Sequence, residues 1–338
     1  MKAYRFEDFQ SLDHLRLHDE PDAQPQRGEL LIRVRAVSLN YRDIAMLSGK
    51  YPRAHKPGLI PTSDGAGEVI AVGEGVGAFK VGDRVIGTFH PRWYAGPMHE
   101  TMGREAYGDQ NDGWLTERKT VSQEAVVKFG GALSYEEAAT LPCAGLTAWT
   151  ALSGPAPIRA GHTVLVQGTG GVSIFALQLA RAVGARVIAT TSSAGKAPRL
   201  LELGAGDVVN YVETPEWGKA VRALAGGRGV DRVVEVGGPG TINQSLRAVA
   251  PGGEIASIGF LSEDNPGIDF FSLKLSGASF RNIAVGDRAG LQELVRVVEG
   301  AHLKPVVDRT FSFGEAREAF AHLSKSAHFG KVVIRVSA

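Results

Sequence analysis

The sequence has little cysteine and no excess of charge of either sign. Cys143 is the only cysteine among 338 residues, so an internal disulfide is excluded and a reducing compartment is expected. Lys and Arg total 37 against 36 Asp and Glu, which leaves a formal net charge of +1. Such a balance provides no electrostatic footprint for nucleic acid or an anionic membrane, so a small molecule is the expected partner.

Long hydrophobic runs are also missing. No apolar stretch approaches the roughly 18 residues of a membrane span, and the Met1–Glu7 segment lacks the apolar core of a signal peptide. We therefore expect a cytoplasmic protein. The length exceeds what a single compact core usually holds and predicts two domains. The 43 glycines are scattered at turns between apolar strands, which indicates many tight connections.

The most informative motif is a glycine turn between a predicted strand at 163–167 and a predicted helix at 174–183. A helix that begins directly after such a turn offers unpaired backbone N–H groups to a diphosphate. Gly168 permits the sharp turn and Gly170 lets the backbone approach the phosphates, whereas Ser173 stands where the dinucleotide fingerprint normally has glycine. The predicted contacts are Gly168, Thr169, Gly170, Gly171 and Val172.

No acidic residue lies between Ser173 and Arg199. An NAD site usually places Asp or Glu about 20 residues after the glycines, where the carboxylate holds the ribose hydroxyls. The strand at 185–189 is instead followed by Thr191, Ser192 and Lys196. Hydroxyls and cations suit a 2′-phosphate, so the sequence favours NADP over NAD. The same residues are also typical of a solvated loop and helix start.

The pattern of predicted elements changes along the chain. Up to about residue 125 it is rich in strands, at 29–37, 67–72 and 83–87, which indicates a small barrel-like domain. From about 135 to 265 strands and helices alternate, which is typical of a parallel sheet that binds ligands at the carboxyl ends of its strands. Its later strands are predicted at 207–211, 230–236 and 253–259. An amphipathic helix near 288–300 precedes a last strand at 331–336, which is expected to return to the first domain.

Five motifs occur in a characteristic order: Asn40-Tyr-Arg-Asp43, Asp64-Gly-Ala-Gly-Glu-Val69, Val81-Gly-Asp-Arg-Val85, Leu141-Pro-Cys-Ala-Gly-Leu-Thr-Ala-Trp149 and Gly168-Thr-Gly-Gly-Val172. Through them the chain resembles medium-chain dehydrogenases/reductases over essentially its whole length, in the zinc-free branch similar to quinone oxidoreductases. The resemblance implies an α/β fold with a GroES-like β-barrel-type catalytic domain at 1–128, to which 290–338 returns. It also implies a Rossmann domain with a doubly wound parallel sheet at 129–289, and an active site in the cleft between the domains.

The resemblance also bears on metal binding. Members with a catalytic zinc use Cys, His and Cys at three positions that here hold Asn40, Ser63 and Cys143. A zinc site needs at least three suitable ligands, so neither this site nor the four-cysteine structural lobe is expected, and no metal is predicted. His90 and His99 with Asp109 or Asp112 are the alternative candidates, although such residues more often belong to a surface loop. Cys143 is expected to be a small packed residue.

Without a metal, the chemistry has to rely on the nicotinamide and on hydrogen-bond donors. Reduction of a quinone, enone or related carbonyl by NADPH fits, because the developing enolate or phenolate oxygen needs only donors. Asn40, Tyr41 and Tyr51 are the catalytic candidates, and Arg42 is a candidate for stabilising negative charge. Each has an ordinary explanation too, since Tyr51 can pack a loop and Arg42 can pair with Asp43.

Further cofactor contacts are expected at strand ends. Gly237, Gly259 and Phe260 finish strands and are expected to face the ribose and nicotinamide. By the resemblance, Asn40 and Thr147 lie on the nicotinamide side and Tyr211 at the adenosine phosphate, although Tyr211 also fits a strand-end aromatic that closes the core. The segment 88–118 either lines an apolar substrate cleft or anchors a long loop. Its aromatic residues are Phe89, Trp93, Tyr94, Tyr107 and Trp114.

Two other functions stay open at this stage. One is alcohol dehydrogenase-type oxidation with NAD or NADP, with or without a recruited metal, and the other is nucleotide binding without relevant turnover. A homodimer is expected, because the apolar segment 275–284 matches where relatives pair their Rossmann sheets across a two-fold axis. The alternative is an edge strand covered by its own loops.

Overall fold

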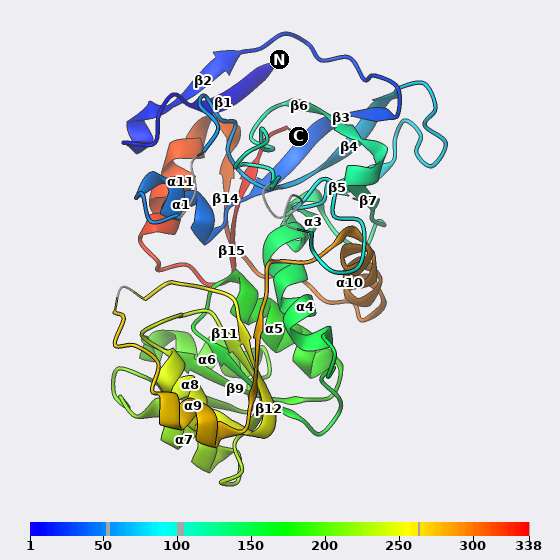
Figure 1. The fold of residues 1–338 in the computed structure, drawn as a ribbon. Helices are drawn as coiled ribbons and strands as arrows, with labels where there is room; N and C mark the ends of the chain where they lie inside the picture. The colour runs from blue at the N-terminus through cyan, green and yellow to red at the C-terminus, as the bar shows by residue number, and fades with distance from the viewer. Residues whose placement is uncertain (52–54, 100–104, 263, 338) are drawn as a thin grey trace. The chain divides into compact units, whose positions relative to one another are not determined.

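The computed structural model describes residues 1–51, 55–99, 105–262 and 264–337. The chain forms two compact units, Met1–Leu146 with Val285–Ala338, and Thr147–Ala284 (Figure 1). The sequence placed these boundaries at 128/129 and 289/290. Residues 129–146 join the first unit because α3 (Tyr135–Ala138) contacts its strands β3 (Glu29–Ser38) and β4 (Asp64–Val72), and the π-helical turn Leu141–Gly145 contacts β4.

The first unit is built on a seven-stranded sheet with the order β14-β15-β3-β4-β5-β7, in which β6 also pairs with β3. Its remaining strands are β5 (Arg84–Gly87), β6 (Arg118–Ser122), β7 (Val126–Lys128), β14 (Val307–Ser312) and β15 (Lys331–Arg335). The predicted return of the last strand is confirmed, since β15 pairs antiparallel with β3 (red beside blue in Figure 1). The chain begins with a separate hairpin of β1 (Lys2–Phe6) and β2 (Leu15–Asp19).

Trp114 is the largest fully buried side chain of this unit. A Cβ atom at Gly65 would lie 2.4 Å from its ring, and one at Gly87 would lie 2.2 Å from it, so β4 and β5 need glycine where the indole packs. The Tyr107 ring meets Trp114 edge-on, with 5.9 Å between centroids. These two aromatic residues of the 88–118 segment therefore belong to the core. Residues 100–104 of that segment lie outside the described residues.

The longer helices in the described part of the first unit are α1 (Tyr41–Leu47), α10 (Arg288–Gly300) and α11 (Ala316–Ser324). The amphipathic helix predicted at 288–300 is confirmed as α10. Asp287 caps it by accepting from the Gly290 N–H, and its apolar residues at helical spacing are buried. No helix among the described residues is long and apolar enough to cross a membrane.

The second unit contains a parallel sheet with the order β10-β9-β8-β11-β12-β13. Its strands are β8 (Thr163–Gln167), β9 (Arg186–Thr191), β10 (Asp207–Asn210), β11 (Val230–Glu235), β12 (Val249–Ser257) and β13 (Ser279–Asn282). In chain order this is the 3-2-1-4-5-6 arrangement of doubly wound sheets, with its switch point between β8 and β11. The predicted alternation of strands and helices is confirmed, although β12 begins four residues before the predicted strand.

The helices of the second unit follow or precede these strands. They are α4 (Leu146–Ser153), α5 (Gly171–Ala182), α6 (Ala197–Glu202), α7 (Trp217–Leu224), α8 (Ile242–Ala248) and α9 (Phe270–Ser276). The buried face of α5 includes Ile174, Phe175, Leu177 and Leu179, at the helical spacing seen in the sequence. This packing holds the first turn of α5 directly after β8.

Candidate functional site

The glycine turn has the geometry of a phosphate-binding loop. Gly168 follows β8 with φ +71°, a left-handed conformation that favours glycine. Gly170 is the N-cap of α5, and no side chain caps it. The N–H groups at the start of α5 are therefore left for a ligand, and the helix dipole favours an anion there.

The contacts of Ser173 show why serine is accepted where the dinucleotide fingerprint normally has glycine. Its side chain is buried, and its hydroxyl donates to the main-chain oxygen of Gln167 over 2.6 Å. The hydrogen bond joins the first turn of α5 to the end of β8. Serine at this position thus satisfies its polar group within the fold and fits where helix and strand pack closely.

The end of β9 lies beside the glycine turn. Lys196 Nζ donates to Thr169 Oγ1 over 3.2 Å, so the predicted cation is brought to the predicted diphosphate loop. Thr191 is buried and its hydroxyl accepts from the Ser193 N–H over 3.2 Å, while Ser192 is exposed. The loop after the carboxyl end of β9 therefore offers hydroxyl groups and a cation together.

Tyr211 follows β10 and donates its backbone N–H to Thr191 O over 3.0 Å. Its side chain is 40% exposed, so it does not close the core. Thr147, at the start of the second unit, is buried in α4. The roles predicted for these two residues at the cofactor stay predictions.

Glycines also finish β11 and β12. A Cβ atom at Gly259 would lie 2.1 Å from Val236 O, and one at Gly237 would lie 2.4 Å from Thr241 Oγ1. The fold itself therefore needs glycine at both positions. A cavity of about 290 Å³ opens at these strand ends, lined by Glu235, Gly238, Ile242, Ser257, Gly259 and Phe280, among others. Phe260, the predicted neighbour of the nicotinamide, is 40% exposed.

In the first unit, residues 40, 63 and 143 meet around Asp64. Asn40 Nδ2 donates to Asp64 Oδ2 over 3.0 Å and reaches Ser63 Oγ at 3.4 Å, and the Cys143 N–H reaches Asp64 Oδ2 at 3.3 Å. Lys331 Nζ, at the start of β15, donates to Asn40 Oδ1 over 2.5 Å. The Asn40 amide is thus engaged on both its oxygen and its nitrogen.

This cluster balances two cations against two carboxyl groups. Arg42, Asp43, Asp64 and Lys331 are all buried. Burial raises the pKa of Asp43 to about 6 and raises that of Asp64 as well. Burial, reinforced by Asp64, also raises the pKa of the Cys143 thiol, which stays protonated at neutral pH and is a poor nucleophile.

The raised pKa of Asp43 makes stability depend on pH. Because the native state favours the protonated carboxyl, its contribution is present below the ordinary pKa near 4 and is lost as pH rises through about 6. Relative to Asp43→Asn, the wild type should lose up to about 3 kcal/mol of unfolding free energy between pH 4 and pH 7. Urea denaturation of both proteins from pH 4 to pH 7 measures this loss. A difference in unfolding free energy that stays constant with pH would contradict the prediction.

The Arg42 guanidinium uses only part of its hydrogen-bond donors within the described residues. Its Nη2 donates to Tyr107 O over 2.6 Å, and the guanidinium carbon lies 4.6 Å from the centroid of the Phe89 ring. Among the described residues, its buried Nε and Nη1 have no hydrogen-bond partner. Tyr51 lies nearby, with its ring centroid 6.0 Å from the guanidinium carbon. Tyr41, the first residue of α1, is half-buried.

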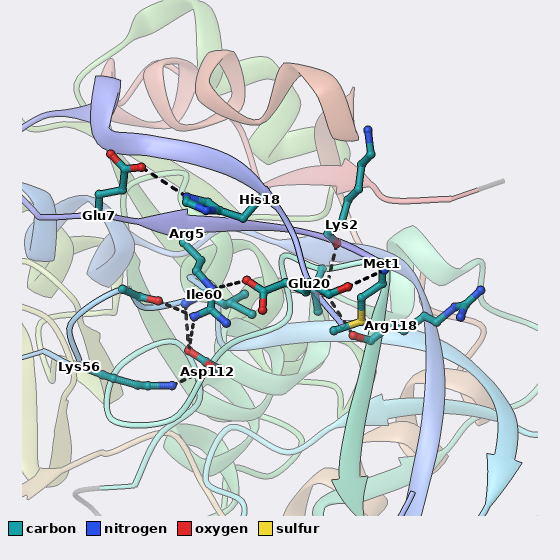
Figure 2. Close-up of polar contacts among 12 residues, drawn as sticks. Met1, Lys2, Arg5, Glu7, His18, Glu20, Lys56, Ile60, Asp112 and Arg118 are labelled. Carbon is teal, nitrogen blue, oxygen red and sulfur yellow. Dashed lines mark hydrogen bonds and ion pairs between the residues drawn. The ribbon is translucent and has the colours of Figure 1, made fainter. Parts of the chain in front are cut away.

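The alternative metal ligands are engaged elsewhere. Asp112 pairs with Lys56 and with Arg5 (Figure 2). Its carboxylate oxygens lie 2.7 Å from Lys56 Nζ and 3.5 Å from Arg5 Nη1. Asp109 pairs with His55 over 3.1 Å, and the buried His90 packs against Phe89. Within the described ranges, no three His, Cys, Asp or Glu side chains come together as a metal site.

Lys331 of the cluster around Asp64 and Glu235 of the cavity were not singled out from the sequence. Lys331 is a charged residue at the head of a strand and directly precedes three apolar residues, and this contrast was the available signal. Glu235, which is fully buried at the end of β11, carried the same signal. A charge inside a buried strand needs partners, and those of Lys331, Leu39 and Asn40, come from a segment far away in the chain.

Two family models match the chain. "Alcohol dehydrogenase GroES-like domain" matches residues 26–131, and "Zinc-binding dehydrogenase" matches residues 171–300. A zinc-type alcohol dehydrogenase-like protein of Schizosaccharomyces pombe is 38% identical over 315 residues, which cover 91% of both chains. An acryloyl-coenzyme A reductase of Metallosphaera sedula is 31% identical, covering 93% of this chain and 94% of the relative.

Solved structures share the whole fold. One described as an NAD-dependent alcohol dehydrogenase superposes with a TM-score of 0.91 at 32% identity and covers 100% of both chains. A mycobacterial protein complexed with NADPH superposes with a TM-score of 0.83 at 29% identity, covering 99% of this chain and 100% of its own. These matches confirm the predicted GroES-like and Rossmann folds.

Proposed function

Because the chain belongs to the medium-chain dehydrogenase/reductase superfamily, an oxidoreductase family, we propose that it is an NADPH-dependent, zinc-independent reductase of a quinone, an enone or a related conjugated carbonyl. The observation that carries the cofactor assignment is the hydrogen bond from Lys196 to Thr169 of the glycine turn. It brings a cation and hydroxyl groups to the strand end where an NAD site has a carboxylate. When bound, the nicotinamide supplies the hydride.

Zinc independence is supported by the chemistry of the side chains around Asp64. Asn40 and Ser63 lack the thiolate and imidazole groups that hold zinc, which leaves Cys143 as the one ligand type at these three positions. The Lys331 ammonium donates to the Asn40 amide in the same cluster. A resident cation already balances the buried carboxyl groups, so the residues do not fit a zinc ion.

Arg42 is the group that we assign to the substrate oxygen. Hydride addition to a conjugated carbonyl places negative charge on its oxygen, which hydrogen-bond donors stabilise. Arg42 Nε and Nη1 are buried donors without partners among the described residues, and such donors are costly unless a ligand accepts from them. Tyr51, next to Arg42, is the candidate for a second donor.

The assay that tests this function follows NADPH oxidation against a panel of quinones, enones and enoyl thioesters, with zinc measured in the purified protein. We expect turnover without bound zinc. Arg42→Met should lower kcat/KM about 100-fold, as expected for a lost oxyanion donor. Arg84→Met is the matched control. Arg84 also stacks on an aromatic ring, at 4.4 Å from Phe129, but its Nη1 and Nη2 donate to backbone oxygens.

Three outcomes would contradict the proposal. Stoichiometric zinc that is required for turnover would favour alcohol dehydrogenase-type chemistry. Tight NADPH binding without any acceptor that supports turnover would remove the enzymatic function. Equal losses in Arg42→Met and Arg84→Met would remove Arg42 from the substrate site.

A homodimer formed through the edge of the parallel sheet is part of the proposal. β13 is an edge strand of the sheet, and its Phe280 is 43% exposed. On α9, which precedes β13, Phe271 is 72% and Leu275 is 80% exposed. Exposed apolar side chains on an edge strand and on the helix that precedes it favour a symmetric partner. Phe271→Asp should convert the dimer to a monomer in light scattering, whereas Leu201→Asp, at another exposed leucine, should not. A monomeric wild type would refute it.

A further inference from the structure

Glu235 is a fully buried carboxylate at the end of β11. It accepts hydrogen bonds from both backbone and side-chain donors. The backbone N–H groups of Gly237 and Gly238 donate to Oε1 over 2.9 and 3.0 Å, and Thr241 Oγ1 donates to it over 2.5 Å. Ser245 Oγ donates to Oε2. A single side chain therefore determines the path of the loop that follows β11.

Gln167 connects this loop to the glycine turn. Its Nε2 donates to Glu235 Oε2 over 2.7 Å, and its Oε1 lies 3.3 Å from the N–H groups of both Val236 and Gly237. Gln167 is the last residue of β8 and directly precedes Gly168. The Gln167–Glu235 pair thus joins the loops after β8 and β11, the two strands that flank the switch point of the sheet.

The loop after β11 needs such a tether. Gly237, Gly238 and Gly240 leave its backbone many conformations, and Gly238 adopts a left-handed one at φ +85°. Hydrogen bonds to a buried carboxylate are about twice as strong as neutral ones, so Glu235 selects one conformation of this loop. The loop is thereby preorganised before any ligand arrives.

The position of the tether indicates which part of the cofactor it serves. A doubly wound sheet consists of two mononucleotide-binding halves. The β8–β10 half carries the glycine turn and Lys196, which we assigned to the diphosphate and the 2′-phosphate. The β11–β13 half carries the Glu235 loop and the cavity of about 290 Å³ that Glu235 and Gly238 line.

We propose that Glu235, held by Gln167, is a positioning residue for the nicotinamide half of the cofactor: it shapes the 236–241 loop that receives the nicotinamide riboside and contributes nothing to the adenosine half. The inference rests on the proposed function, since it presumes a nicotinamide dinucleotide. It assigns a function to a buried charge that the hydride-transfer proposal does not use.

Calorimetric titration of the full chain with NADPH and with adenosine 2′,5′-bisphosphate tests this. The bisphosphate has the adenosine 2′-phosphate but no nicotinamide. Glu235→Gln, which removes the charge at nearly constant volume, should raise the Kd for NADPH about tenfold or more and change the Kd for the bisphosphate less than about twofold. Gln167→Met, which breaks the tether and keeps the carboxylate, should show the same selectivity with a smaller effect.

The ratio of the two dissociation constants separates positioning from a purely structural role. Glu254→Gln is the matched control, because Glu254 is buried in the neighbouring strand β12 but binds Arg232 and Arg281. It should lower the unfolding midpoint and leave the ratio unchanged. If Glu235→Gln fails to fold, Gln167→Met decides alone.

Equal weakening of both ligands, or no weakening, in both Glu235→Gln and Gln167→Met would overturn the inference. Failure of the proposed function looks different, because the wild type would then bind neither ligand. If the wild type prefers NADH, the 2′-phosphate assignment fails, and the same comparison with NADH and ADP still tests Glu235.

Discussion

Replacing Lys196 by glutamate is expected to raise the Kd for NADPH about 100-fold and the Kd for NADH less than about threefold. A 2′-phosphate carries close to two negative charges, and charge-assisted hydrogen bonds to it contribute much more than neutral ones. Lys196 Nζ reaches the glycine turn at Thr169, so the ammonium lies at the strand end where the 2′-phosphate is expected. NADH has no such phosphate, so its Kd should change little when Lys196 is replaced.

Fluorescence titration with both cofactors measures the two constants on the same protein preparations. Lys196→Gln separates loss of charge from its reversal and should give an intermediate effect on NADPH alone. Lys219→Glu is the control, because Lys219 is an exposed lysine of α7 that pairs with Glu216. If Lys196→Glu weakened NADPH and NADH equally, the 2′-phosphate assignment would be wrong.

Replacing Glu254 by alanine should lower the free energy of unfolding by about 3–5 kcal/mol, because it leaves the buried Arg232 guanidinium without its carboxylate partner. Glu254 Oε1 lies 3.2 Å from Arg232 Nη1 and 2.8 Å from Arg281 Nη2, between β11 and β13. Arg232 is 1% exposed, and burial lowers the pKa of its guanidinium. Both arginines also donate to Ala151 O, so the network ties the end of α4 to the sheet.

Urea denaturation measures this loss, and Glu216→Ala is the matched control. Glu216 also lies near two cations, at 2.8 Å from Lys219 and 3.6 Å from Arg247, but it is exposed. Water already solvates its charge, so its removal should leave the unfolding midpoint unchanged. Equal shifts in the two variants would show that burial does not strengthen the Glu254 network.

The features of the fold that sequence predicts here are those set by local pattern. The glycine turn, the strand before it and the amphipathic α10 each depend on residues within one short segment. Apolar periodicity predicts such elements because one face of a helix or strand must be buried. The hairpin of β1 and β2 was missed, since it has no distinctive pattern of its own.

The 88–118 segment shows why local sequence pattern does not predict the candidate site. Its aromatic residues fitted either a substrate cleft or an anchored loop, and composition does not distinguish the two. Trp114 turned out to be buried beside Gly65 and Gly87, which lie in other segments, and Tyr107 packs against Trp114. Only the packing of β4 and β5 against the indole reveals why those two glycines are present.

The sequence by itself determined the family, the two folds and the glycine turn after β8, because ordered short motifs and strand–turn–helix patterns carry that information locally. Tertiary structure decided how the charges are used. It brought Lys331 to Asn40, Lys196 to Thr169, and Gln167 to Glu235, pairs separated by 27 to 291 positions in the chain. A buried charge is stable only with partners at hydrogen-bonding distance, and the fold alone determines which residues provide them.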